Sequence, residues 1–199
     1  MGRIMKKILL LIVVGVGVLL LTRNANAYQI LATKKQALKI VLGSGVKITT
    51  IVKKLAGEEK HEVESKLGNS LIYQPPAGGS TWGVVPSKTF TFYKGTKNGK
   101  EVGIALIDVE PGRWGKNTYM IGLNPDGSVK RVVVMSYREI WGRPIASPGW
   151  LHQFAGKNIK NTIEVGKDIS SVGGATISSS SAAFAVKKAV VVYWAFFLK

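Results

Sequence analysis

The chain has 199 residues, of which 46% are apolar and 20% are charged, so its size and composition suit one globular domain with a small appendage. It contains no cysteine, which excludes disulfides, thiolate metal sites, iron–sulfur clusters and cysteine nucleophiles. The 28 basic and 11 acidic residues give a net charge of +17. The two histidines, His61 and His152, are distant in sequence and lack a carboxylate cluster, so we interpret both as surface residues rather than metal ligands.

Residues 1–27 are predicted to direct export. Three basic residues precede an apolar run from Ile8 to Leu21, which is shorter than the roughly 20 residues that span a bilayer. An Ala-Asn-Ala tripeptide ending at Ala27 follows, and small residues at its first and third positions are typical of a signal-peptidase site. The segment is either cleaved after Ala27 or retained as a membrane anchor. Both alternatives place the rest of the chain outside the cytoplasmic membrane, in the periplasm or on the membrane's outer face.

The chain after Ala27 keeps 24 basic and 11 acidic residues. Outside the cytoplasm, this excess favours anionic lipid head groups, acidic wall polymers or an acidic redox partner over nucleic acid. The lysines are scattered along the sequence, so most of them are expected to be solvated surface residues.

Residues 28–87 are predicted to form a helical lead-in segment. Thr33–Gly43 has a threonine cap, spaced apolar residues and a terminal glycine, and it predicts a short helix. Ala56–Gly68 begins with acids and ends with a lysine and a glycine, which matches the helix dipole. The β-branched stretch 46–55 between them fits a helix or a strand. Paired prolines and glycines make 73–86 a loop.

From residue 88 the apolar pattern changes to a period of two. The turn dipeptides Asn98-Gly99, Pro111-Gly112 and Asp126-Gly127 separate four such segments, which predicts a four-stranded antiparallel meander. We therefore expect an α+β domain over 88–199, with an antiparallel meander sheet packed against helices.

Two helices are expected after the meander. Ser147–Gly156 has a serine cap, proline at the first helical position and a glycine stop. The final segment predicts a helix capped by one of the serines in Ser178–Ser181. Its apolar tail, Ala189–Leu198, is too short to span a bilayer and is expected to pack in the core.

The segment SSVGGATISSSS, Ser170–Ser181, cannot bury much surface. Gly173 and Gly174 tolerate positive φ and leave their N–H groups open to a ligand. Thr176 adds a hydroxyl, and the following helix start is a natural anion site. From the residues alone, the segment is either a flexible turn before a helix or a phosphate seat.

The stretch DISSVGGATISS resembles the attachment motif of the FMN-binding domain family, an acid followed by [ST]-G-A-T and hydroxyl residues. FYKGTKNGKEVGIAL, IGLNPDGSVKRVVVM, REIWGRPI and WLHQFAGK are similar to other family segments, so the resemblance covers about residues 88–190. The family includes flavin-carrying subunits of the sodium-translocating NADH:quinone reductase and related ion-pumping complexes. The resemblance implies that a flavin transferase joins FMN through a phosphoester to Thr176.

The resemblance also implies a set of cofactor-binding residues near the motif. The acid is expected from Asp168, and Glu139 resembles an acid that precedes the flavin site in relatives. Tyr137, Trp141 and Trp150 flank the region and either stack on the flavin or belong to the core. The predicted cofactor-binding residues are Thr176, Ala175, Gly174, Gly173, Ser178, Asp168 and Glu139.

Two positions depart from the family pattern. Gly173 stands where a serine or threonine is usual, and Ser170 stands where many members carry an acid. Both positions belong to the segment that the flavin transferase recognises, so they bear on attachment more than on the fold.

The function implied is an exported flavoprotein that relays electrons in a membrane-associated or extracytoplasmic redox chain. It would act with a redox partner protein or membrane complex, as a carrier or subunit rather than a stand-alone enzyme. The alternative is a non-flavinylated binding module of the same fold that docks to a redox complex or an anionic membrane surface. A hydrolase using a serine of Ser178–Ser181 is disfavoured, because neither histidine has an evident orienting partner.

The export signal makes a direct prediction. Because the charged start, the short apolar run and the Ala-Asn-Ala site coincide, we expect processing after Ala27. N-terminal sequencing of the exported protein should therefore begin at Tyr28. A membrane-bound product that begins at Met1 would establish the anchor instead.

Overall fold

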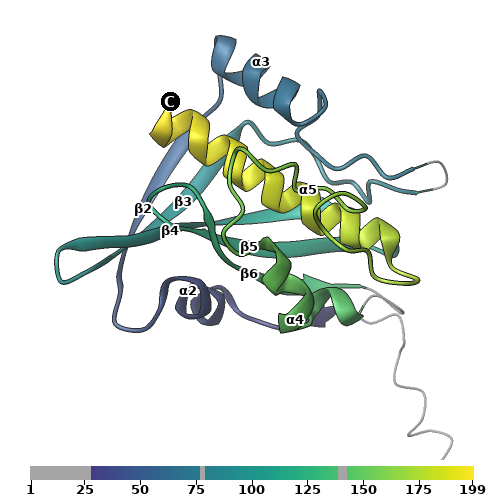
Figure 1. The fold of residues 1–199 in the computed structure, drawn as a ribbon, viewed down its shortest axis with the longest axis horizontal. Helices are drawn as coiled ribbons and strands as arrows, with labels where there is room; N and C mark the ends of the chain where they lie inside the picture. The colour runs from purple at the N-terminus through teal and green to yellow at the C-terminus, as the bar shows by residue number, and fades with distance from the viewer. Residues whose placement is uncertain (1–27, 77–78, 139–142) are drawn as a thin grey trace, which may run out of the picture.

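A computed structural model describes residues 28–76, 79–138 and 143–199, so the predicted export segment lies outside the described residues. The chain forms one antiparallel sheet with helices on both faces (Figure 1). The strand order is β1-β6-β5-β4-β3-β2. The strands are β1 (Gln29–Ile30), β2 (Lys47–Lys54), β3 (Thr89–Lys97), β4 (Lys100–Pro111), β5 (Lys116–Leu123) and β6 (Val129–Tyr137). The predicted α+β class is confirmed.

Strands β3 to β6 form the predicted meander. Asn98 and Gly99 have φ of 51° and 74° at the tip of the β3–β4 hairpin, and Gly127 has φ of 82° between β5 and β6. Both hairpin positions predicted from the sequence are confirmed. Pro111 is the last residue of β4, so the third turn begins one residue later, at Gly112.

The segment before the meander contributes two helices and two strands. Helices α2 (Lys34–Leu42) and α3 (Gly57–Lys66) confirm the predicted helices, and Thr33 caps α2 in a capping box with Gln36. The stretch that fits a helix or a strand is the edge strand β2, paired with β3 over its whole length. Strand β1 pairs with β6 at the opposite edge.

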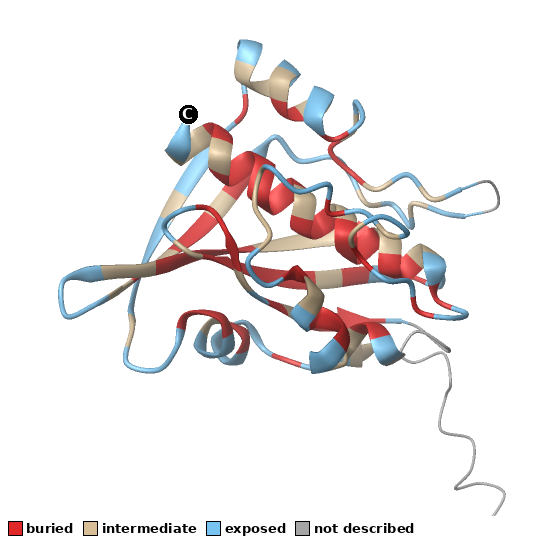
Figure 2. Cartoon of the chain, viewed as in Figure 1, coloured by how far each residue is buried: buried red, intermediate tan, exposed pale blue. Residues whose placement is uncertain are grey.

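The alternation of side chains divides the core into two layers. Helix α5 (Thr176–Tyr193), extended by the π-helical turn η3 (Trp194–Leu198), covers one face, and α2 covers the other (Figure 1). Phe92, Leu106 and Ile121 belong to the larger α5-side core. Their neighbours Tyr93, Ala105 and Met120 belong to the smaller α2-side core. Figure 2 shows buried residues along the inner side of α5 and the sheet beneath it.

Helix α5 begins at Thr176, earlier than predicted. The residue before it, Ala175, is the N-cap and has no capping side chain, so the expected serine cap is wrong. The physical reason is a turn in which the Ala175 N–H donates to the Val172 carbonyl at 2.9 Å. Because this turn ends at Ala175, the helix begins at the next residue, before the serines. Ser179 and Ser181 lie fully buried within the helix instead.

The span Thr176–Leu198 has the length and hydropathy of a membrane-crossing helix. Of its most apolar window, 61% is buried inside the protein, and the helix lies on β4 and β5. It is therefore a core helix, as its short apolar tail predicts.

A short helical cluster follows the meander. It consists of η1 (Arg143–Ala146), α4 (Pro148–Leu151) and η2 (His152–Phe154). The Ser147 hydroxyl accepts the Trp150 N–H at 3.3 Å, which confirms the predicted cap.

Gly122 in β5 sets how closely α2 approaches the sheet. A Cβ added there would lie 2.8 Å from the Cβ of Val41 in α2. We expect Gly122→Ala to lower the free energy of unfolding by about 1–3 kcal/mol, because overpacking displaces the helix. Gly149→Ala is the control, since its added Cβ meets no atom within 4 Å. Urea denaturation of both variants tests this, and equal stabilities would contradict it.

Candidate functional site

The motif residues form a tight turn at the start of α5. The turn runs from Val172 to Ala175, closed by the hydrogen bond between these two residues. Gly174 has φ of 73°, a conformation that disfavours residues with a side chain, so the turn requires glycine there. A Cβ added at Gly173 or Gly174 would meet no atom within 4 Å, which leaves open space beside this backbone.

Hydrogen bonds hold this turn against the rest of the domain. The Ser170 N–H donates to Gln153 Oε1 at 2.8 Å, and the Trp150 indole N–H donates to the Ser170 carbonyl at 2.9 Å. Ser179 Oγ accepts the Val172 N–H at 3.2 Å and donates to the carbonyl of the N-cap at 3.0 Å. The segment is therefore an anchored loop, not a slack linker.

Thr176 is exposed at the first position of this 18-residue helix. Because the N-cap is an alanine, the N-cap side chain offers no hydrogen bond to the first-turn N–H groups. Such a helix end favours an anion, because its N–H groups and the positive end of the helix dipole point outward. Hydroxyl, open backbone and anion-favouring helix end thus lie together.

Asp168 stabilises the loop that precedes the motif. Its carboxylate accepts the N–H groups of Ile163 at 3.1 Å and Glu164 at 2.8 Å, and it pairs with Lys157 at 3.0 Å. Burial alone would raise the pKa of Asp168, but the Glu164 N–H and the Lys157 ammonium hold it below its ordinary value. Its oxygens therefore serve the fold of 163–168.

The other predicted residues separate into two groups. Ser178 is fully buried in the first turn of α5, so it does not share the exposed surface of Thr176. Tyr137 and Trp150 are buried in the α5-side core. Glu139 and Trp141 lie outside the described residues.

A cavity of about 250 Å³ lies along α5, beginning one helical turn after Thr176 at Ser180. It is lined by Ser180, Phe184 and Lys187, which follow Thr176 at helical spacing, and by Tyr73 from the loop opposite. The Tyr73 and Phe184 rings lie 6.2 Å apart. None of these residues was predicted from the sequence. Ser180, Phe184 and Lys187 follow Thr176 at i+4, i+8 and i+11, and this spacing could have indicated that they share its side of the helix.

A buried ion cluster joins the middle of α5 to β4. Lys188 pairs with Asp108 at 2.8 Å and with Glu110, and its ammonium also donates to the Leu71 carbonyl at 2.9 Å. Burial and the charge of Asp108 raise the pKa of Glu110 to about 8, outweighing the attraction of Lys188. One proton on Glu110 makes the cluster of one cation and two carboxylates neutral overall.

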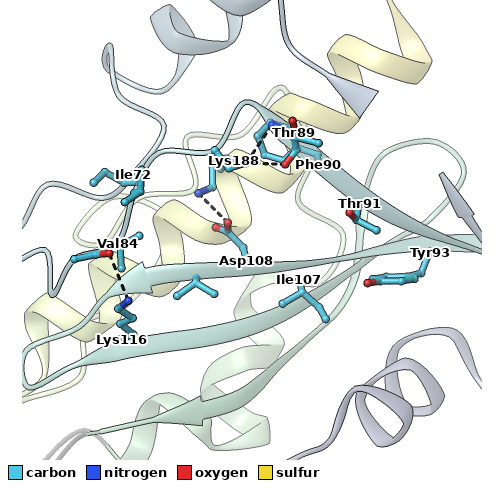
Figure 3. A pocket seen from close by; sticks show the side chains of 14 residues that line it. Ile72, Val84, Thr89, Phe90, Thr91, Tyr93, Ile107, Asp108, Lys116 and Lys188 are labelled. Carbon is cyan, nitrogen blue, oxygen red and sulfur yellow. Dashed lines mark hydrogen bonds and ion pairs between the residues drawn. The ribbon is translucent and has the colours of Figure 1, made fainter. Parts of the chain in front are cut away.

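A cavity of about 610 Å³ lies beside this cluster, where β3 and β4 separate. The two strands pair from Phe92 and Leu106 toward their hairpin. Before Phe92 in β3 and after Leu106 in β4 the two strands no longer pair with each other, although β3 still pairs with β2 and β4 with β5. Figure 3 shows Lys188 and Asp108 facing each other at this opening, with Phe90 and Thr91 on the opposite strand.

Comparisons with known proteins bear on the family and on the fold. Residues 112–191, which include the turn and Thr176, match the family model described as the FMN-binding domain. The fold is similar to the crystal structure of Shewanella oneidensis NqrC, with a TM-score of 0.51 and 18% identity. That match covers 84% of this chain and 89% of the other. No curated protein sequence matches the chain. The predicted resemblance to the FMN-binding domain family is confirmed.

The raised pKa of Glu110 makes stability depend on pH. In the native state its carboxyl keeps a proton up to about pH 8, whereas the unfolded chain releases it near the ordinary value of 4.5. The free energy of unfolding should therefore fall as pH rises from about 5 to about 8.5. The loss should reach a few kcal/mol, since one pKa unit corresponds to about 1.4 kcal/mol.

Glu110→Gln, which cannot ionise, should lack this fall in stability. Exposed Glu164→Gln is the matched control and should keep the parent's profile. Urea denaturation at several pH values measures the difference. An identical pH profile for parent and Glu110→Gln would contradict the assignment.

Proposed function

We propose that this chain, which contains an FMN-binding domain, is an exported flavoprotein that carries FMN covalently on Thr176 and relays electrons outside the cytoplasmic membrane. The observation that carries the proposal is the exposed Thr176 hydroxyl at an uncapped helix start, within the region that matches the family model. The attachment motif found in the sequence points to the same oxygen.

The residues around Thr176 fit a flavin nucleotide. Gly173 and Gly174 leave room for a phosphate, and the helix end favours its negative charge. The cavity beside the helix has aromatic walls from Tyr73 and Phe184, which suit the contact surface of a planar ring system. Lys187 adds a positive charge at this cavity.

In the attachment step, the Thr176 hydroxyl oxygen would displace a nucleoside monophosphate from the FMN phosphorus of a flavin dinucleotide. The hydroxyl would lose its proton as the new P–O bond forms, and the P–O bond of the diphosphate bridge would break. A flavin transferase supplies the catalysis. The covalent bond keeps FMN on the protein outside the cytoplasm, where cytoplasmic FMN cannot refill an empty site. When bound, FMN supplies redox chemistry that the side chains lack.

The chain's own part is to hold and orient the cofactor. Trp150 and Gln153 fix the loop through Ser170, and Ser179 fixes the turn to the helix. A carrier of this design needs a redox partner protein or membrane complex as donor and acceptor. The resemblance to flavin-carrying subunits of ion-pumping complexes supports such a partner.

Thr176→Ala tests the attachment. Co-expressed with a flavin transferase and exported, the parent should give a band whose flavin fluorescence survives denaturing electrophoresis, and Thr176→Ala should give a folded but colourless protein. The change should alter stability by no more than about 0.5 kcal/mol, because the residue is exposed. Thr176→Ser keeps the hydroxyl and should retain some flavin. Denaturation-resistant flavin on Thr176→Ala would move the site to a neighbouring serine.

Gly173 provides a second, opposite test. Serine is accommodated there, because its Cβ meets no atom and the backbone is not left-handed. Gly173→Ser restores the usual motif residue and should raise the fraction of flavinylated protein, measured by intact mass. If neither the parent nor Gly173→Ser carries flavin with a matched transferase, the chain is a binding module that has lost attachment.

A further inference from the structure

The two faces of the sheet differ in charge. Residues 28–54, which hold β1, α2 and β2, contain no acidic residue, and three of their six lysines (Lys34, Lys35 and Lys39) belong to α2, whereas Lys53 lies over the Phe196 and Phe197 rings on the α5 side. On the opposite side, α3 alone carries four glutamates and packs against α5. The remaining acids of the described residues also lie on that side. Asp108 and Glu110 pair with Lys188 of α5, and Glu101 and Asp126 lie near Tyr193 of α5. Glu164 and Asp168 lie in the loop beside α5.

The lysines of the two faces also differ in their partners. On the α5 side, several lysines form ion pairs with acids, such as Lys157 with Asp168 and Lys167 with Glu164. On α2, Lys35 and Lys39 are exposed, and no described carboxylate forms an ion pair with either. The excess positive charge of α2 is therefore available to an external anion.

Exposed aliphatic side chains lie among these lysines. Ile30 is 74% exposed, Leu31 is 47% exposed and Ile40 is 44% exposed. Figure 2 shows exposed residues on the outer side of α2. We call the surface formed by these three residues with Lys35 and Lys39 the α2 face.

Two grooves flank α2 and combine apolar walls with basic rims. One, of about 670 Å³, has Leu38, Val46 and Ile48 among its walls and the α2 lysines at its rim. The other, of about 460 Å³, lies between α2 and α4 and has Ile40 and Arg131 in its lining. Apolar side chains beside basic ones match the boundary between acyl chains and anionic head groups, where lysines keep their ammonium groups in the polar layer.

We propose that the α2 face docks on an anionic phospholipid bilayer. The charge partition supplies the orientation, and the exposed aliphatics supply contact with the acyl boundary. The N-terminal end of the described fold agrees with this: β1 comes directly before α2 in the chain, and only seven residues, 22–28, separate the apolar run ending at Leu21 from β1. Seven extended residues span at most about 25 Å, so a retained anchor would keep the α2 face near the bilayer.

This docking places Thr176 away from the lipid. Helix α5 and α2 lie on opposite faces of the sheet, so a bilayer against α2 leaves the start of α5 open to a soluble or membrane-bound partner. The inference rests on the proposed extracytoplasmic location but not on flavin attachment, because docking is measured on protein without flavin.

Amine footprinting of the full chain in vesicles tests the proposal. The chain is reconstituted into phosphatidylcholine vesicles with and without phosphatidylglycerol, and the acetylation rate of each lysine is read by peptide mass. Lys35 and Lys39 should react about fivefold more slowly with phosphatidylglycerol present, and high salt should restore their rates. Lys160, exposed in the loop on the α5 side, is the internal control and should react equally in both vesicles.

A charge-reversal pair separates docking from tethering. Lys35→Glu/Lys39→Glu should restore the reactivity of Lys34 in anionic vesicles, whereas Lys160→Glu/Lys167→Glu should not. Both pairs should keep the parent's urea denaturation midpoint, which reports that they fold and keeps this test independent of the proposed attachment. Equal lysine reactivity in both vesicle types would overturn the proposal and leave the α2 face to a protein partner.

Discussion

The buried ammonium of Lys188 fixes the position of helix α5 on the sheet. It belongs to a side chain that is buried in the core, and it is held by two carboxylates of β4 and a backbone carbonyl. An apolar helix packed by small side chains could otherwise slide along the sheet, whereas a buried cation with a single set of partners allows one register. Thr176 begins the same helix twelve residues earlier, about 18 Å along its axis. The position of the candidate attachment oxygen therefore depends on an ion cluster far from it.

The sheet works as a partition between two chemically different surfaces. Side-chain alternation directs Asp108 and Glu110 to the α5 side, while their neighbours face away from it. The described carboxylates gather on the side that holds Thr176, whereas the α2 side has exposed lysines and no described carboxylate. An electron carrier needs one surface that holds it in place and another on which its redox partner can approach the cofactor. In this domain the sheet separates these two surfaces.

Local signals predicted much of this molecule, and contacts between distant residues account for the rest. Asn98-Gly99 and Gly127 tolerate the left-handed backbone of tight hairpin turns at low cost, so the two hairpins could be predicted from these residues. Strand β2 could not, because as an edge strand it is exposed on both sides along most of its length and lacks alternation. The motif identified Thr176, but Tyr73 lies about a hundred residues earlier in the chain, and only the fold brings it to the cavity. Lys188 was overlooked within an apolar helix, although a single buried lysine there implies a carboxylate partner.

For a chain exported as proposed, the lysines of α5 also matter before the protein folds. The segment Thr176–Leu198 is apolar enough to enter a bilayer, and a translocon sorts such segments by their hydrophobicity as they pass its lateral gate. Lys187 and Lys188 stand at the middle of the segment, where each lysine adds about 2.5–3.5 kcal/mol to the cost of insertion. In the unfolded chain they have no carboxylate to offset that cost, so they oppose retention as a stop-transfer helix. A leucine at position 188 would therefore change the fate of the nascent chain as well as the packing of the finished core.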